Sequence, residues 1–168
     1  MRNKDPLTMK DYNDVVSIYH SESDRAAVIL AAAFLEEYMG HYLKSNLIKD
    51  TMVDDLFENN GPLSTFDSRA KMLYAMGLLP RVYIDDIKYI KKIRNYFAHH
   101  PRHISFDTTN IKDLCSNLST SKTMINGEVN SMLESEPRRQ YLLAIALVIM
   151  HMHTANIRTI DFSNINGA

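Results

Sequence analysis

The sequence predicts an all-α protein, a helical bundle of about six or seven helices with two long central helices at about 22–46 and 137–158. Apolar residues recur at helical spacing along most of the chain, and no alternation typical of β-sheets stands out. Only five glycines and five prolines interrupt the 168 residues. The apolar content of 45% and charged content of 23% are ordinary for a globular protein with a buried core.

Length and composition favour one domain, residues 1–168, in a cytoplasmic protein. The longest apolar run, residues 141–150, is shorter than the ~20 residues that a membrane-spanning helix needs. The start of the chain has no apolar stretch of the kind found in signal peptides. Cys115 is the single cysteine, so neither a disulfide framework nor a zinc-type cysteine pattern is expected. Its apolar surroundings predict a small buried side chain.

Two helices are expected before residue 50. Residues 7–20 carry apolar side chains at helical spacing and predict a short first helix. Ser21 or Ser23 can cap the helix at 22–46, and Asp24 would lie in its first turn, near the positive end of the helix dipole. Ten consecutive apolar residues follow shortly after, so this helix is expected to be central.

Breakers divide the rest of the chain. They are the turn signal at 59–62, Gly77, and Pro101, which disfavours helical conformation just before it. Residues 119–135 are left unassigned, apart from Asn126-Gly127, which is typical of a short hairpin turn. The helices predicted here are about 50–58, 65–76, 81–98, 107–118 and 137–158.

Two sequence blocks between residues 20 and 103 carry a family resemblance. The first is Ser23-Asp24-Arg25-Ala26-Ala27, followed by the apolar helix and Glu36-Glu37. The second joins Gly61-Pro62-Leu63 to an Arg-x-Lys-x-x-Tyr-x-x-Gly spacing that begins at Arg69. Together these blocks resemble the mannitol operon repressor-like proteins, the MltR family.

That resemblance implies an all-helical cytoplasmic regulator that assembles as an oligomer, most simply a homodimer, without a recognised DNA-binding motif. It implies repression of a carbohydrate operon, the mannitol operon by name, through a protein partner. Direct DNA binding is also disfavoured by the residues themselves, because no helix-turn-helix pattern is present. We expect structural or interface roles for Asp24, Arg25, Glu36, Glu37 and Arg69.

A second motif lies at the end of the helix at 81–98. Arg94-x-x-x-x-His99, with Asn95 beside the arginine, resembles the motif of HEPN domains, helical dimers that include many metal-independent ribonucleases. In such a ribonuclease His99 would move the proton, Arg94 would hold the phosphate, and Asn95 could orient His99. Five residues on a regular helix turn through ~140°, so the helix must distort before Pro101 or two subunits must combine their motifs.

A structural interpretation competes with this one. Arg94 would pair with an acid on the neighbouring helix, and Asn95 and His99 would satisfy backbone groups where their helix ends. The candidate acids are Asp24, Glu36 and Glu37. The ribonuclease needs Arg94 and His99 to be accessible and close together, whereas a regulator needs a sizeable exposed apolar or charged patch.

Neither a metal nor a cofactor is expected. The histidines at 99, 100, 103, 151 and 153 lack the spacing of known metal motifs. Lys88, Lys91 and Lys92 share a helical face, but Asp85 and Asp86 interrupt the positive charge, so a solvated face is favoured over a nucleic-acid site. The leading hypothesis is an MltR-like regulator that acts through proteins. The alternatives are a HEPN-type ribonuclease or RNA-binding module and a scaffold without a ligand.

Overall fold

The computed structural model describes residues 22–100, 103–118 and 136–163, and these residues form six helices and no strand. The all-α prediction is therefore confirmed for the described residues. The predicted helix at 7–20 and the turn at 126–127 lie outside them. The helices are α2 (Asp24–Ser45), α3 (Thr51–Asp55), α4 (Phe66–Ala75), α5 (Arg81–His99), α6 (Thr109–Ser116) and α9 (Pro137–Ser163).

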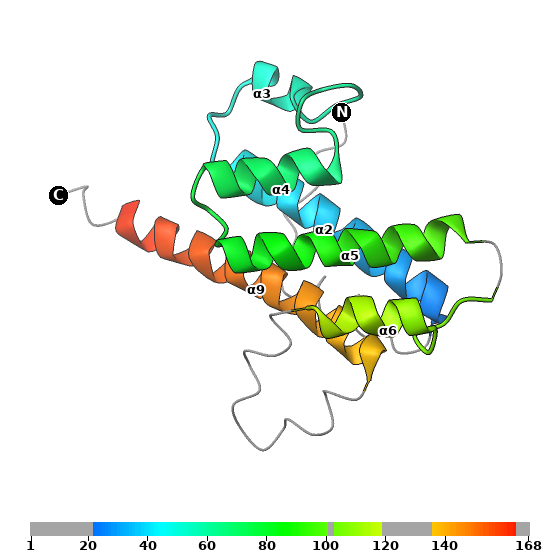
Figure 1. The fold of residues 1–168 in the computed structure, drawn as a ribbon. Coiled ribbons are helices and arrows are strands. Elements are labelled where there is room, and N and C mark those ends of the chain that lie inside the picture. The colour runs from blue at the N-terminus through cyan, green and yellow to red at the C-terminus, as the bar shows by residue number, and fades with distance from the viewer. Residues whose placement is uncertain (1–21, 101–102, 119–135, 164–168) are drawn as a thin grey trace.

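Helices α2 and α9 lie side by side in the middle of the bundle (Figure 1). Helix α2 packs against α4, α5 and α9, while α9 also packs against α5 and α6. Tyr141 donates a hydrogen bond to the carbonyl of Val28 over 3.1 Å, and further along Tyr38 Oη lies 3.1 Å from His153 Nδ1. The first contact lies near the start of both helices and the second lies later in both, so α2 and α9 run in the same direction.

The start of α2 follows the sequence prediction. The Ser23 side chain caps the helix by accepting a hydrogen bond from the Ala26 amide over 3.3 Å. Ala27 and Ala31 are fully buried, and such small side chains let neighbouring helices approach α2 closely. Helix α9 continues to Ser163, beyond the predicted end near residue 158.

One hydrophobic cluster connects α2, α4, α5, α6 and α9. Near the start of α9, the ring of Phe106 contacts Phe97 and Tyr141, with centroid distances of 5.4 and 5.9 Å. Cys115 is fully buried in the same cluster, and this burial raises the pKa of its thiol to about 12. Its predicted role as a small buried hydrophobic residue is confirmed. No helix within the described residues is long and apolar enough to cross a membrane.

The two glycine turns that flank α4 have different physical causes. A β-carbon at Gly61 would lie 2.4 Å from the Leu56 carbonyl oxygen, so only glycine fits at this position. Gly77 has a φ of +69° and lies in open space, where the left-handed conformation ends α4. The amides of Gly77 and Leu78 donate to the carbonyls of Tyr74 and Leu73, which is the pattern of a Schellman motif.

Candidate functional site

Asp24 links two helix starts to the loop before α6. Its Oδ1 accepts a hydrogen bond from Arg138 Nη1 over 2.7 Å, and its Oδ2 accepts one from the Phe106 amide over 3.0 Å. Arg138 also donates to the carbonyl of Glu22 over 2.8 Å. A cation in the first turn of α9 is unfavourable next to the helix dipole, and the Asp24 carboxylate offsets that cost.

Arg25 binds the C-terminal end of α5. Its guanidinium donates hydrogen bonds to the carbonyls of Phe97 and His100, the second over 2.7 Å. The last carbonyls of a helix have no partner within the helix, and a cation is favourable at this negative end of the dipole. The block Ser23-Asp24-Arg25 thus joins α2, α5 and α9, and its role in the described residues is structural.

Arg69 joins α4 to the middle of α2. Its Nε donates to the Leu63 carbonyl over 2.9 Å, and its Nη1 donates to the Glu36 carbonyl over 2.8 Å. A β-carbon at Gly40 would lie 3.1 Å from Arg69 Nη1, so the glycine gives the guanidinium room against α2. Glu36 takes part through its backbone, and the carboxylate of Glu37 lies 3.9 Å from His41 Nε2.

Arg94 does not pair with Asp24, which is bound to Arg138 instead. The Arg94 guanidinium lies over the ring of Phe66, with 5.7 Å between its central carbon and the ring centroid. Its Nε is buried, and among the described residues it has no hydrogen-bond partner. No carboxylate of the described part of the chain forms a salt bridge with Arg94. The ion pair considered from the sequence is therefore not formed there.

Helix α5 stays helical through His99, so distortion before Pro101 does not bring His99 to Arg94. Asn95 is partly buried, whereas His99 is exposed. The next residue makes the contacts at the helix end: His100 Nδ1 lies 2.9 Å from the Tyr96 carbonyl, and its ring stacks on that of Tyr96 at 4.0 Å. A joint site for Arg94 and His99 would thus need two subunits.

The basic face of α5 is partly balanced by acids. Asp85 accepts hydrogen bonds from Arg81 over 3.1 Å and from Lys88 over 2.8 Å, and Lys91 pairs with Asp67 of α4. These side chains are solvent-exposed or partly so, which agrees with the predicted solvated face. Within the described ranges, no group of three or more His, Cys, Asp or Glu side chains is placed to hold a metal ion.

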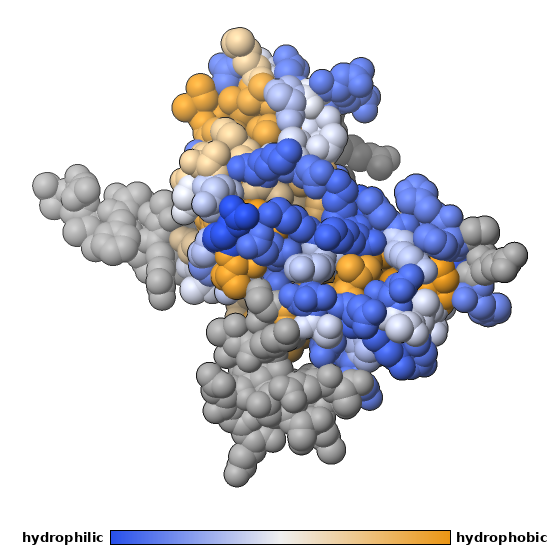
Figure 2. Space-filling view, in the orientation of Figure 1, coloured by the Kyte–Doolittle hydropathy of each residue, from blue (hydrophilic) through white to orange (hydrophobic). Residues whose placement is uncertain are grey.

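An exposed apolar surface at α3 was missed by the sequence analysis. Ile48 and Met52 are each 77% exposed, far more than the other large apolar side chains of the described residues. Figure 2 shows hydrophobic surface gathered over α3 and the adjoining end of α4. We call Ile48, Met52 and Val53 the α3 patch. The signal in the sequence was available, because the apolar pairs Leu47-Ile48 and Met52-Val53 are flanked by polar residues on both sides.

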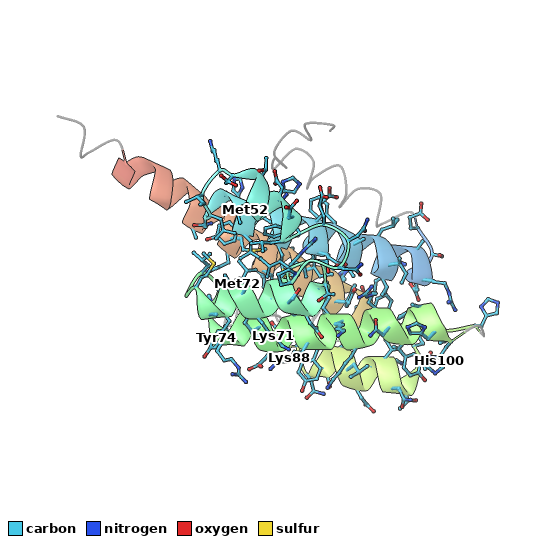
Figure 3. The ribbon with its side chains drawn as sticks, turned by 90° about the horizontal axis from the view of Figure 1, so that it is seen from above. Met52, Lys71, Met72, Tyr74, Lys88 and His100 are labelled. Atoms are coloured by element: carbon cyan, nitrogen blue, oxygen red, sulfur yellow. The ribbon has the colours of Figure 1, made fainter. Side chains whose placement is uncertain are left out.

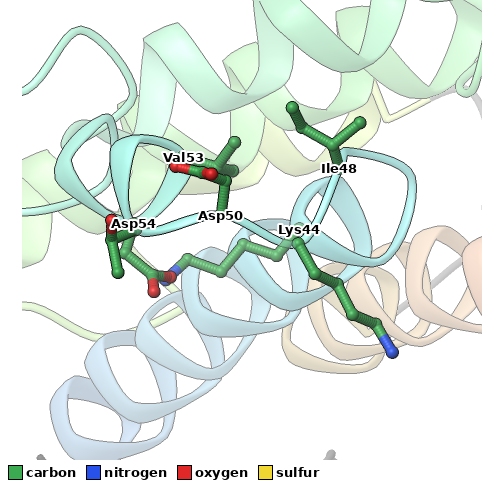
Figure 4. Close-up of a pocket in the computed structure, with 7 residues that line it drawn as sticks. Lys44, Ile48, Asp50, Val53 and Asp54 are labelled. Carbon is green, nitrogen blue, oxygen red and sulfur yellow. The ribbon is translucent and has the colours of Figure 1, made fainter.

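The α3 patch borders a shallow cavity of about 360 Å³ between the end of α2 and α3 (Figure 4). Lys44 crosses one side of it and donates a hydrogen bond to Asp54 over 2.7 Å. The patch is well separated from His100 at the end of α5 (Figure 3). The cavity is lined by Lys44, Ile48, Lys49, Asp50, Thr51, Val53 and Asp54.

Comparison with known proteins assigns the family. The model of the mannitol repressor family, MtlR, matches residues 22–158. The chain therefore belongs to the mannitol repressor family, a family of repressor-like regulators, as its two sequence blocks indicated. A search of curated proteins found no match.

Two solved structures share the fold. One is described as a possible transcriptional regulator, YggD, from Shigella flexneri 2a; it is 18% identical, with a TM-score of 0.68, over 87% of this chain and 97% of that chain. The other is MtlR from Escherichia coli in complex with HPr; it is 18% identical, with a TM-score of 0.67, over 83% of this chain and 96% of that chain.

Proposed function

We propose that this protein is a cytoplasmic repressor-like regulator of carbohydrate metabolism that acts by binding another protein rather than by contacting operator DNA itself. The observation that carries the proposal is membership of the mannitol repressor family across most of the chain. The Escherichia coli protein with the same fold was solved in complex with HPr, which makes a small HPr-like protein the first partner to test.

The surface of the described residues supports a protein partner over nucleic acid. Arg81 and Lys88 on α5 share Asp85, and Lys91 pairs with Asp67, so part of the positive charge on that face is compensated. At the far side of α4, the α3 patch exposes large apolar side chains, which is the kind of surface that protein interfaces bury.

The test is a titration of the purified protein with HPr from its own host, followed by calorimetry. We expect saturable binding in the micromolar range, about −8 kcal/mol. A parallel gel-shift assay with promoter DNA of the mannitol operon should show no retardation by the protein alone. Deletion of the gene should raise expression from that promoter in a reporter strain.

Two results would contradict the proposal. Unchanged reporter expression in the deletion strain would remove the role in transcription. Tight, salt-sensitive binding of the isolated protein to promoter DNA would mean that it contacts the operator directly. Absence of HPr binding alone, with derepression still seen, would redirect the search to a different protein partner.

A homodimer is the second part of this proposal. Leu30 on α2 is 45% exposed and Met150 on α9 is 46% exposed, so both central helices offer apolar side chains to a second copy. Light scattering coupled to gel filtration should give twice the chain mass of 19.3 kDa. Leu30→Glu should shift that mass toward the monomer, whereas the exposed α3 substitution Met52→Lys should leave it unchanged.

A further inference from the structure

The α3 patch is built differently from the rest of the surface. Helix α3 contains no buried residue, although the Asp50 side chain fixes its start by accepting a hydrogen bond from the Met52 amide over 2.8 Å. Lys44 and Asp54 join α3 to the end of α2. The exposed side chains of Ile48 and Met52 are therefore held on an ordered frame, and the fold itself gives no reason to expose them.

The charged side chains on α3 and in the turn after it are all acidic. Residues 50–58 contain four acids and no Lys or Arg. Lys44 neutralises Asp54, while Asp50, Asp55 and Glu58 are exposed. The cavity lining itself is balanced, with Lys44 and Lys49 against Asp50 and Asp54, and the excess of negative charge comes from Asp55 on α3 and from Glu58 just after it. The rim of the patch is therefore net acidic.

The acidic rim argues against a second copy of this chain as the occupant. A two-fold symmetric contact would place the patch against itself, so that Asp55 and Glu58 of both copies would face like charges. A ligand with apolar side chains flanked by Lys and Arg would instead match both the patch and its rim.

Size and flexibility favour a helix as that ligand. A cavity of about 360 Å³ holds one or two large side chains, and the unbranched Met52 beside it can adapt to different shapes. Amphipathic helices bind apolar grooves through anchors at i, i+3 or i+4, with charged residues along their edges. An acidic rim favours Lys and Arg along those edges, because charges across an interface are complementary.

We propose that the α3 patch is a docking site for a basic amphipathic helix of a partner protein. The inference rests on the proposed function, in that it assigns a surface to a regulator that works through protein contacts. It is independent of HPr, because the patch is defined by its own chemistry.

The probe is a fluorescein-labelled peptide of about 14 residues made of Leu and Lys at helical spacing, together with its counterpart in which Glu replaces Lys. Fluorescence anisotropy with the full-length protein should give saturable binding of the Lys peptide, at least about tenfold tighter than that of the Glu peptide. Raising the salt concentration should weaken the binding.

Matched variants assign the binding to the patch. Met52→Lys and Ile48→Lys should each weaken the Lys peptide about tenfold, while Ala98→Lys, with the same change of charge at the exposed end of α5, should leave it within about twofold. Asp55→Asn combined with Glu58→Gln should weaken binding more than Asp113→Asn combined with Glu22→Gln, which also removes two exposed acids. All these side chains are exposed, so the fold is expected to tolerate the changes.

The proposal is overturned if Ala98→Lys weakens the peptide as much as Met52→Lys, because binding would then follow net charge alone. It is also overturned if Met52→Lys turns a dimer into a monomer, since the patch would then be a contact between copies. If peptide binding behaves as expected but reporter expression is unaffected by gene deletion, the docking site stands and the proposed function fails.

Discussion

At the scale of single residues, Asp24 has contacts that no local sequence pattern reveals. Its partner Arg138 is 114 positions away, and the amide of Phe106 is 82 positions away. The carboxylate therefore links segments that are far apart in the sequence, at the start of both central helices. The side chains of Asp24 and Arg138 are each about three-quarters buried, so water can replace the lost contacts only partly.

Asp24→Asn should lower the free energy of unfolding by about 2 kcal/mol, since it removes the charge from a hydrogen-bonded and largely buried pair. Chemical denaturation measures this. Asp107→Asn is the control, because the Asp107–Lys112 pair is exposed and should cost less than about 0.5 kcal/mol. Equal effects of the two substitutions would show that Asp24 is no more than a surface acid.

Arg94 and His99 differ in what their removal should do. Arg94→Ala should cost about 1 kcal/mol of stability, because the guanidinium packs over Phe66, whereas exposed His99 should tolerate alanine. We expect no cleavage of a labelled RNA pool in EDTA by the wild-type protein. Cleavage that is lost in both folded variants would establish the HEPN-type ribonuclease in its two-subunit form.

At the scale of elements, turns and caps decide where the helices begin and end. Ser23, Asp50 and Thr65 cap α2, α3 and α4 through their side chains. Such signals are local, so they could be seen in the sequence for α2 and α4. Helix α3, at Thr51–Asp55, is shorter than the segment predicted at 50–58, because the amides of Leu56 and Phe57 donate to the carbonyls three residues earlier and close the chain into turns.

Gly61→Ala should destabilise the protein by about 3 kcal/mol, since the new methyl group would overlap backbone atoms that cannot move aside. Gly77→Ala should cost only about 1 kcal/mol, because open space surrounds it and only the left-handed conformation is strained. Thermal and chemical denaturation of both variants test whether Gly61→Ala costs more stability than Gly77→Ala. A larger loss for Gly77→Ala would contradict the close approach at Gly61.

At the scale of the whole molecule, a thiol buried in the core should make the free energy of unfolding fall as the pH rises through the alkaline range. Burial raises the pKa of Cys115 to about 12, above its ordinary value of 9.0. Between these values the unfolded chain releases the thiol proton and the folded chain keeps it, so stability should fall by up to ~1.4 kcal/mol per pH unit. Below the ordinary value the thiol contributes no pH dependence.

Unfolding measured at about pH 8 and about pH 10 checks this expectation. The loss of stability should be smaller in Cys115→Ala than in the wild type. Tyr38 and Tyr42 also have pKa values raised by burial, so both proteins should share the loss that these tyrosines cause. An identical loss in the two proteins would mean that the thiol ionises equally well in the folded state.

The sequence by itself determined the helical class, most helix boundaries, the buried character of Cys115 and the family. These features depend on periodicity, capping residues and motifs, which are local in the chain. Only the tertiary structure decided that Asp24 pairs with Arg138, that Arg94 lies over Phe66, and that the α3 patch is exposed. Pairing and exposure depend on which distant segments pack together, and helical spacing alone does not specify those neighbours.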